Sequence, residues 1–285
     1  QSLACTGREN QGRLEDRGMP EQLDFLAAIP APTPSTAPIP PPEPTATPQS
    51  GVPETLLIID TETTGLDPLQ DRCLEVGAIL FDVASRAVLC QQSFLLPVDS
   101  NPAEAINHIS AYVTRRPQPW QDALRWFDQL LSAADLLVAH NAAFDRQWFG
   151  IDPLPAALKP WLCTMDDIRW PDDRQLRSRP SVRDLALAYG VPVWAAHRAL
   201  TDCIYLADVF ARCDDLEELL LRGMEPRQLM RARLSFEERH LAKAAGFRWN
   251  DPVKGAWTRR LSEREISELD FPVVMVELEK NRITA

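Results

Sequence analysis

The chain has 285 residues, of which 45% are hydrophobic and 25% are charged, and its net charge is −11 at pH 7. Most of it is therefore expected to fold, as one substantial domain with an appendage. No apolar run is long enough for a transmembrane helix, so we expect no membrane partner. The first residues lack a basic stretch followed by an apolar one, and we read no signal peptide there.

The cysteines show neither a C-x-x-C pair nor a regular spacing with histidines. We interpret them as free, buried thiols of a cytoplasmic protein, in preference to zinc ligands or disulfides. They are Cys5, Cys73, Cys90, Cys163, Cys203 and Cys213.

The charge is distributed unevenly along the chain. Residues 222–264 carry eleven Lys and Arg but five Asp and Glu, a net charge of +6, which leaves −17 on the rest. An acidic body built around a metal site, with a basic flank, is compatible with a polyanionic substrate.

Residues 1–54 form a predicted disordered N-terminal region. Within it, residues 30–53 contain ten prolines among Ala, Thr and Ser, a composition that cannot bury a core. We interpret this segment as a linker or tether, with a docking motif as the alternative.

A folded domain is predicted for residues 55–221. The apolar run Leu56-Leu57-Ile58-Ile59 is typical of a central strand that is buried on both faces. Further strands are expected at 73–83, 87–97 and 136–139, and helices at 120–134, 143–149, 181–189 and 197–213. This order, with its leading three-strand meander, predicts an α/β fold with a mixed central sheet flanked by helices.

Residues 222–285 read as a small α+β C-terminal module. A helix is expected at 236–245, ended by Gly246, and an extended segment begins at Phe247. A turn at 251–255, a strand at 256–258, a short helix capped by Ser262 and a strand at 271–278 complete the module.

Two carboxylates follow the first strand in the motif I-I-D-T-E-T-T-G. Asp60 and Glu62 are two residues apart, so their side chains point to the same side of the strand. Neighbouring carboxylates repel each other unless a cation lies between them, and oxygen ligands suit Mg²⁺ or Mn²⁺ better than zinc. A D-x-E pair alone is more often solvated charge, but the buried strand before it and the Thr-Thr-Gly after it favour a metal site.

Two later motifs add an imidazole and two more carboxylates. Asp145 closes H-N-A-A-F-D, about one turn into a helix, where a first-turn acid favoured by the helix dipole is the alternative. His197 and Asp202 frame H-R-A-L-T-D. Their spacing of five does not share a helix face, so we place His197 in the lead-in loop and Asp202 on the helix.

Together these three motifs resemble the DEDDh family of 3′→5′ exonucleases, which includes the proofreading epsilon subunit of bacterial DNA polymerase III. The resemblance covers about residues 56–213 and implies a ribonuclease-H-like fold with two divalent cations. It implies that His197 is the general base and that a nucleoside 5′-monophosphate is released. The implied metal ligands are Asp60, Glu62, Asp145 and Asp202.

The resemblance also implies contacts to the substrate. His108 and Ile109 fall where many relatives have His-Gly-Ile. His140 is a candidate for substrate binding, with packing against the strand as its alternative, and Asn141 is a candidate beside it. The residues aligned with the loop that holds the terminal nucleotide are Thr63, Thr64, Gly65 and Leu66.

The C-terminal module alternates aromatic and basic residues between 247 and 260. Basic groups contact phosphates and aromatic faces stack bases, so this stretch is a candidate single-strand binding surface. The alternative is that the aromatic residues form the core of the module and the arginines its solvated face. The candidate binding residues are Arg248, Trp249, Trp257, Arg259 and Arg260.

We therefore predict a metal-dependent 3′→5′ exonuclease that acts on DNA 3′ ends or single strands, in proofreading or repair. An RNA-trimming exonuclease with the same site is the first alternative, since the choice depends on how the substrate loop treats a 2′-hydroxyl. A non-catalytic nucleic-acid-binding scaffold is the second, although a scaffold has no need for four converging carboxylates. A polymerase or another replisome protein is the candidate protein partner.

Overall fold

The computed structural model describes residues 51–195 and 197–276. The predictions for the proline-rich segment and for Cys5 lie outside these residues, apart from the last few positions of the linker. The predicted end of the last strand, residues 277 and 278, lies outside them as well.

The first half of the described chain forms a five-stranded sheet, called here the main sheet, with the strand order β3-β2-β1-β4-β5. The meander β1, β2 and β3 is antiparallel, whereas β4 and β5 run parallel to β1. This is the predicted mixed sheet, and the ribonuclease-H-like α/β fold is confirmed. The strands are Thr55–Thr63 (β1), Cys73–Asp82 (β2), Ala87–Leu95 (β3), Leu136–Ala139 (β4) and Trp161–Cys163 (β5).

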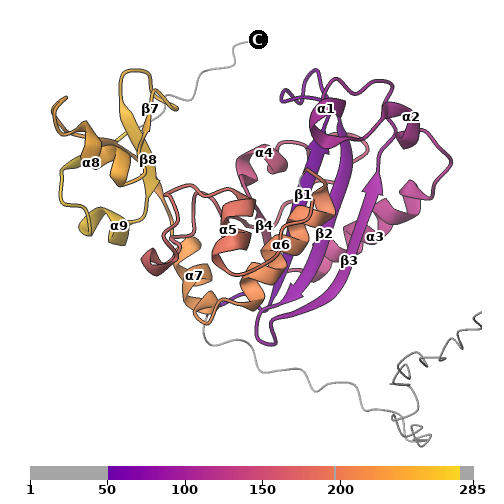
Figure 1. Ribbon diagram of the computed structural model, residues 1–285, viewed down its shortest axis with the longest axis horizontal. Helices are drawn as coiled ribbons and strands as arrows, with labels where there is room; N and C mark the ends of the chain where they lie inside the picture. The colour runs from indigo at the N-terminus through magenta and orange to yellow at the C-terminus, as the bar shows by residue number, and fades with distance from the viewer. Residues whose placement is uncertain (1–50, 196, 277–285) are drawn as a thin grey trace, which may run out of the picture. The chain divides into compact units, whose positions relative to one another are not determined.

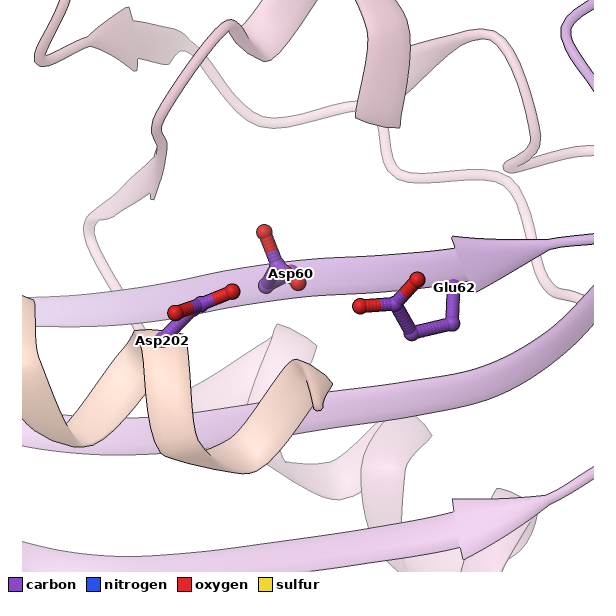
Figure 2. Close-up of side chains that lie close together, drawn as sticks. All are labelled: Asp60, Glu62 and Asp202. Carbon is purple, nitrogen blue, oxygen red and sulfur yellow. The ribbon is translucent and has the colours of Figure 1, made fainter. Parts of the chain in front are cut away.

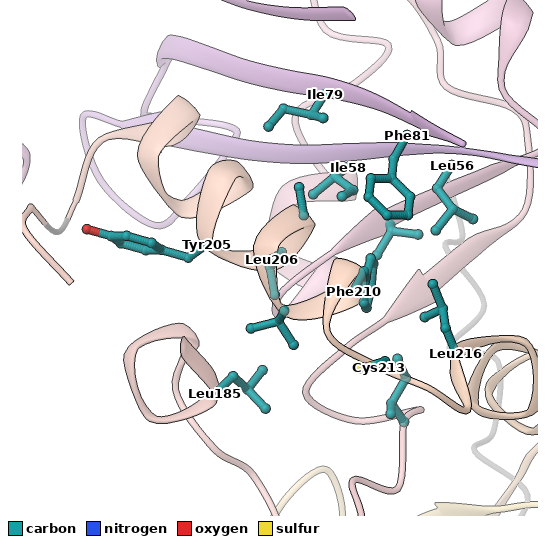
Figure 3. Packing of buried hydrophobic residues seen from close by; sticks show 14 of the residues in the cluster. Leu56, Ile58, Ile79, Phe81, Leu185, Tyr205, Leu206, Phe210, Cys213 and Leu216 are labelled. Atoms are coloured by element: carbon teal, nitrogen blue, oxygen red, sulfur yellow. The ribbon is translucent and has the colours of Figure 1, made fainter. Parts of the chain in front are cut away.

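Helices cover both faces of the main sheet, and successive residues of β1 divide between them. Leu56 and Ile58 pack into one cluster with residues of α5, α6 and α7, whereas Leu57 and Ile59 pack into another with residues of α3. Figure 3 shows Leu206 and Phe210 of α6 beside Ile58 and Phe81 in the first cluster. The helices are Trp120–Ala133 (α3), Val182–Ala188 (α5), Ala199–Ala211 (α6) and Leu216–Gly223 (α7).

Short helices lie in the connections between these elements, as Figure 1 shows for α1, α2 and α4. The structure has them at Glu104–Asn107 (α1), Ala111–Thr114 (α2), Ala142–Arg146 (α4) and Asp172–Arg174 (η1, a 3-10 helix). The predicted helix at 143–149 is thus shorter and begins one residue earlier. Residues 147–149 continue as a turn, in which Trp148 and Phe149 pack on the core.

The C-terminal module contains a second, four-stranded sheet with the order β7-β8-β6-β9 and antiparallel pairing throughout. Its small core is formed by Met230, Ala242, Phe247 and Leu261. The elements are Gln228–Ala232 (β6), Arg239–Ala244 (α8), Arg248–Trp249 (β7), Trp257–Leu261 (β8), Glu263–Ser267 (α9) and Val273–Met275 (β9).

Some predicted boundaries were wrong, and some elements were missed. The predicted helix at 236–245 begins three residues later, because Phe236 belongs to a turn stabilised by hydrogen bonds between Ser235 and Glu238. The long helix begins at Ala199, so His197 and Arg198 precede it. The short helices α1 and α2, helix α7 and strands β5 and β6 were not predicted.

The five cysteines within the described chain, Cys73, Cys90, Cys163, Cys203 and Cys213, are free. None of the helices in residues 51–195 and 197–276 combines the length and hydrophobicity needed to cross a bilayer.

Candidate active site

Strand β1 carries the first two carboxylates. The strand continues through Thr63, so Asp60 and Glu62 lie within it and not after it, and both project to the same side. In the antiparallel register, Asp60 lies opposite Gly77 and Glu62 opposite Glu75 of β2. The main sheet therefore holds both carboxylates on rigid backbone.

Helix α6 brings the third carboxylate to the same point. Figure 2 shows Asp202, in the first turn of α6, beside Asp60 and Glu62. One carboxylate oxygen from each of the three residues lies within 4.8 Å of those of the other two. All three are half-buried, so the group is open to solvent on one side.

Asp145 is held against β1 by hydrogen bonds from Thr61. It projects from α4 and is 2% exposed, and its Oδ1 accepts hydrogen bonds from the Thr61 amide (3.0 Å) and the Thr61 hydroxyl (2.8 Å). Electrostatic repulsion from Asp145 contributes to the raised pKa of Asp60. The fourth predicted carboxylate therefore lies outside the group of three that are within 4.8 Å of one another, with one oxygen bonded to Thr61.

Burial, with the repulsion of neighbouring acids as a second cause, raises the pKa of all four carboxylates. Burial, followed by repulsion from Asp145, Asp202 and Glu62, raises the pKa of Asp60 well above its ordinary value. Burial raises the pKa of Glu62 to about 8, with repulsion from Asp202 as the next cause. Burial also raises the pKa of Asp202 to about 6, against the opposing effect of His197.

For Asp145, burial raises the pKa to about 7, although the hydrogen bonds from Thr61 oppose the shift. Carboxyl groups that are clustered and buried resist ionisation, and a bound cation stabilises their ionised forms. The donors are all carboxylate oxygens, the ligand type of Mg²⁺ and Mn²⁺. The residues present therefore fit a divalent metal ion.

His197 lies directly beside this group. It precedes α6 in a loop, is exposed, and adopts a left-handed backbone conformation with φ 60°. Its backbone N–H donates a hydrogen bond to the Asp202 carboxylate, which helps to keep Asp202 ionised. The loop thus fixes the backbone of His197 against the metal-ligand candidate five residues later.

Glu75 is a further residue of the site, which the motifs did not reveal. It is 1% exposed on β2, and its carboxylate accepts hydrogen bonds from Arg198 Nε (3.0 Å) and Nη2 (2.8 Å). It also accepts from the backbone N–H of Ala199 (3.2 Å) and the hydroxyl of Ser93 (2.8 Å). A buried acid opposite Glu62 therefore anchors the start of α6. The sequence signal was an acid inside an otherwise apolar strand.

The candidate substrate residues after Glu62 differ in whether their side chains bond within the loop or face solvent. The Thr63 hydroxyl donates to the Gly65 carbonyl (2.6 Å), and the Thr64 hydroxyl accepts from the Arg72 amide (2.9 Å). Leu66, by contrast, is 79% exposed. The two hydroxyls stabilise the loop, whereas the side chain of Leu66 is open to solvent.

The next two candidate substrate residues, His140 and Asn141, also lie in different environments. The ring nitrogens of His140 bond to the Thr164 hydroxyl (2.8 Å) and the Pro180 carbonyl (2.9 Å), and burial lowers its pKa to about 4. Both polar atoms of the ring are thus used within the fold. Asn141 directly precedes α4. It is half-buried and has a left-handed backbone conformation with φ 71°.

The aromatic and basic residues of the C-terminal module do not act as one group. Trp249 is 51% exposed and forms a ring pair with Trp257, whereas Phe247 is buried in the module core. Arg248 forms an ion pair with Asp251, Arg259 donates to the Ala245 carbonyl, and Arg260 to the Arg227 carbonyl. The three predicted arginines therefore have partners within the protein.

Comparison with known proteins identifies the family of the region that contains the main sheet and its helices. A family model described as an exonuclease matches residues 57–210, more than half of the chain. The chain belongs to the exonuclease family. The predicted exonuclease family and enzyme class are confirmed. A second family model, described only as a domain of unknown function, matches residues 228–276 of this exonuclease.

Curated relatives include replicative polymerase components. DNA polymerase III subunit epsilon of Treponema pallidum is 29% identical over 158 residues, covering 53% of this chain and 72% of the relative. The PolC-type DNA polymerase III of Thermotoga maritima is 26% identical over 181 residues. This match covers 55% of the exonuclease but 12% of the polymerase, so the chain spans a small part of that relative.

Solved structures of similar fold include other exonucleases. One is exonuclease X in complex with 5′-overhanging duplex DNA, with 26% identity, a TM-score of 0.43, and coverage of 59% of this chain and 98% of that one. Another is E. coli exonuclease I in complex with a dT13 oligonucleotide, with 17% identity, a TM-score of 0.46, and coverage of 67% and 50%.

Proposed function

We propose that this exonuclease removes nucleotides one at a time from the 3′ end of a DNA strand, in proofreading or repair. One observation carries the proposal: three carboxylates from β1 and α6 lie within 4.8 Å of one another, next to an exposed histidine. DNA is the favoured substrate because the curated relatives are components of DNA polymerases.

In this proposal Asp60, Glu62 and Asp202 hold Mg²⁺ or Mn²⁺, and Asp145 completes a site for two ions. Burial, joined by repulsion from neighbouring carboxylates, raises the pKa values of these residues, and bound cations would relieve both effects by stabilising the ionised forms. Bound divalent cations supply the Lewis-acid chemistry that polarises a phosphodiester and acidifies a water molecule.

His197 is the proposed general base. A ring nitrogen of His197 takes the proton of the attacking water, the task that imidazole performs most often in enzymes. The exposed loop position lets the side chain reach a substrate, while the bond from its amide to Asp202 limits how far the backbone moves. Leu66 is the side chain proposed to contact the terminal nucleotide, because it stands out from the loop after Glu62.

The proposed division of the chain follows the sequence prediction. Residues 55–221 are the proposed exonuclease domain, residues 222–285 the C-terminal module and residues 1–54 a tether. The separate matches at 57–210 and 228–276 support the first two units. A polymerase is the proposed partner, in line with the epsilon relative, and the cytoplasm is the proposed location.

The test compares two aspartates of one helix. Asp202→Asn removes a proposed metal ligand, whereas Asp208→Asn removes another half-buried acid of α6, which pairs with Arg212. Loss of a ligand is expected to cost at least the roughly tenfold to hundredfold in activity that loss of an outer-shell metal partner costs. Asp208→Asn is expected to retain wild-type activity.

The assay uses 5′-labelled DNA and RNA of matched sequence, with Mg²⁺ or with EDTA, and resolves the products as ladders. Mg²⁺-dependent shortening from the 3′ end, lost in Asp202→Asn, is the expected result, with DNA degraded faster than RNA. Equal activity of Asp202→Asn and wild type would contradict the site. Faster degradation of RNA would favour the RNA-trimming alternative.

A further inference from the structure

The C-terminal module carries a groove that is separate from the carboxylate group. Its volume is about 490 Å³, and it lies between the turn that precedes α8 and the β7–β8 hairpin. Three aromatic and two basic side chains line it: Phe236, Trp249, Trp257, Arg231 and Arg239.

Two of the three aromatic side chains of this groove, Phe236 and Trp249, lie outside the module core, whereas Trp257 packs against it. Phe236 is 73% exposed and Trp249 is 51% exposed, whereas Phe247 supplies the aromatic ring that is buried. Trp249 lies opposite Trp257 across the β7–β8 ladder, with 5.6 Å between ring centroids. Large aromatic faces left open to water in this way are the platforms on which unpaired bases stack.

The two arginines give the groove a positive charge. The Arg239 guanidinium lies 3.8 Å from the centre of the Phe236 ring, which orients the ring and the charge together. Arg231 is exposed and has no ion pair within residues 51–195 and 197–276. Glu237 and Glu238 precede Arg239 without lining the groove. Exposed cations beside open rings match the alternating phosphates and bases of a single strand.

We propose that this groove binds single-stranded DNA, with bases stacked on Trp249 and Phe236 and phosphates at Arg231 and Arg239. The inference deepens the proposed function and rests on it, because it takes the nuclease substrate as the occupant. It also changes the predicted set of binding residues. Trp249 and Trp257 stay, while Arg231 and Arg239 take the place of Arg248, Arg259 and Arg260, which do not line the groove. Arg239 also donates a hydrogen bond to the Phe236 carbonyl (2.6 Å), which holds its guanidinium at the groove.

The stacking part of the proposal is tested by binding alone. The full chain is titrated into a fluorescein-labelled thymidine oligonucleotide in EDTA, so that metal-dependent cleavage does not interfere, and anisotropy gives the Kd. Trp249→Ala is expected to weaken binding roughly tenfold, the effect of one lost stacking contact. Trp126→Ala is the matched control, because Trp126 of α3 is also 51% exposed and lies outside the groove.

The phosphate part is tested by the salt dependence of the same titration. Arg231→Ala is expected to reduce the slope of log K against log salt by about 0.7, the value for one lost contact to a single strand. Arg233→Ala removes a nearby exposed arginine that does not line the groove, and is expected to leave the slope unchanged. Trp249→Ala is expected to lower the affinity at every salt concentration without changing the slope.

Wild-type affinity in both Trp249→Ala and Arg231→Ala would overturn the proposal, as would equal losses in Trp126→Ala and Arg233→Ala. Tighter binding of an RNA oligonucleotide than of DNA would overturn the choice of DNA. These outcomes are independent of the nuclease test, since Asp202→Asn is expected to lose cleavage and keep groove binding. Circular dichroism melting of each variant shows that it is folded.

Discussion

At the scale of single residues, Glu75 connects the sheet to the loop that carries His197. Its buried carboxylate holds Arg198 by two hydrogen bonds and the Ala199 amide by a third. These two residues follow His197 directly and begin the helix of Asp202. Glu75 is therefore a positioning residue, which acts on the reaction through the backbone at the start of α6.

Glu75→Gln is expected to lower kcat by roughly tenfold to a hundredfold, the usual cost of losing a partner that orients a catalytic or metal-binding group. The neutral amide has one oxygen that can accept a hydrogen bond from Arg198, and it carries no negative charge to pair with the guanidinium. The Mg²⁺ concentration for half-maximal activity is expected to rise as well, because Asp202 shifts with the helix. Steady-state kinetics over a Mg²⁺ series measures both.

The control is Glu265→Gln, which neutralises another buried, arginine-paired carboxylate, far from the motifs in sequence. Both variants are expected to unfold at lower temperature than wild type. A purely structural role of Glu75 predicts that both lose activity in proportion to their stability. A changed Mg²⁺ requirement in Glu75→Gln alone is the result that a positioning role requires.

The raised pKa values of Asp145 (about 7) and Glu62 (about 8) predict how stability depends on pH without metal. The unfolded chain has these carboxyls ionised above about pH 4, so the native state binds more protons and stability falls as pH rises through the native values. His140, with a pKa lowered to about 4, has the opposite effect only up to about pH 6.5. In EDTA, Tm is therefore expected to fall between about pH 6.5 and about pH 8.

Differential scanning fluorimetry across this range checks the sign, with Glu62→Gln as the comparison variant. Removing the Glu62 charge is expected to flatten the fall, since that group no longer titrates. Mg²⁺ competes with the bound protons, so the rise in Tm on adding Mg²⁺ is expected to grow with pH. A Tm in EDTA that increases from pH 6.5 to 8 in wild type would contradict the crowded, metal-free carboxylate group.

At the scale of elements, much of the main sheet could be predicted, because its signals are local. The uninterrupted apolar run Leu56–Ile59 required a strand buried on both faces, and its residues do alternate between two core clusters. Ser181 was predicted to begin a helix, and it forms a capping box with Asp184. The five residues of the three motifs were found because a known family links them.

Other features could not be read from local patterns. The bonds of Glu75 to Arg198 span 123 residues, so only the folded sheet brings the two together. Strand β6, Gln-Leu-Met-Arg-Ala, has no β-branched residue and gains its pairing from β8 and β9, which come later in the chain. Helix α7, in contrast, could have been predicted from its local pattern, because Leu216, Leu219 and Leu220 have helical spacing.

Gly77 of β2 sets how closely α6 approaches the strand that bears Asp60. It lies opposite Asp60, and a Cβ at this position would come within 2.4 Å of the Ala199 and Leu200 backbone. Backbone atoms cannot rotate away, so Gly77→Ala is expected to displace the start of α6. The expected cost is about 1–3 kcal/mol of stability, as for other overpacked sites, together with lost activity from a displaced Asp202.

The matched comparison is Gly223→Ala, at the end of α7. There the added Cβ meets the Leu162 Cδ1 atom at 2.6 Å, a side-chain end that can adjust, and alanine favours helical backbone. Urea unfolding is expected to show a smaller cost for Gly223→Ala than for Gly77→Ala, with activity retained. Equal costs and equal activities would mean that the close approach at Gly77 has no special role.

At the scale of the whole molecule, one buried arginine links residues of the exonuclease domain to the C-terminal module. Arg227 is 4% exposed at its side chain, donates to the Asp167 carbonyl (2.8 Å), and pairs with the Glu265 carboxylate (3.1 Å). Arg169 pairs with the other oxygen of Glu265 (2.6 Å). Two segments matched by separate families therefore share one network of buried charges.

Arg227→Ala is expected to lower the free energy of unfolding by roughly 3 kcal/mol, because breaking a buried pair leaves an uncompensated charge. The low end of the usual range applies because Arg169 still pairs with Glu265. Calorimetry is expected to show one unfolding transition in wild type and an earlier, separate transition of the module in the variant. Arg212→Ala, which breaks an exposed pair on α6, is expected to cost about 0–1 kcal/mol and keep a single transition. If Arg227→Ala costs no more than Arg212→Ala, the network does not couple the two segments, and the module must be held by its apolar contacts instead.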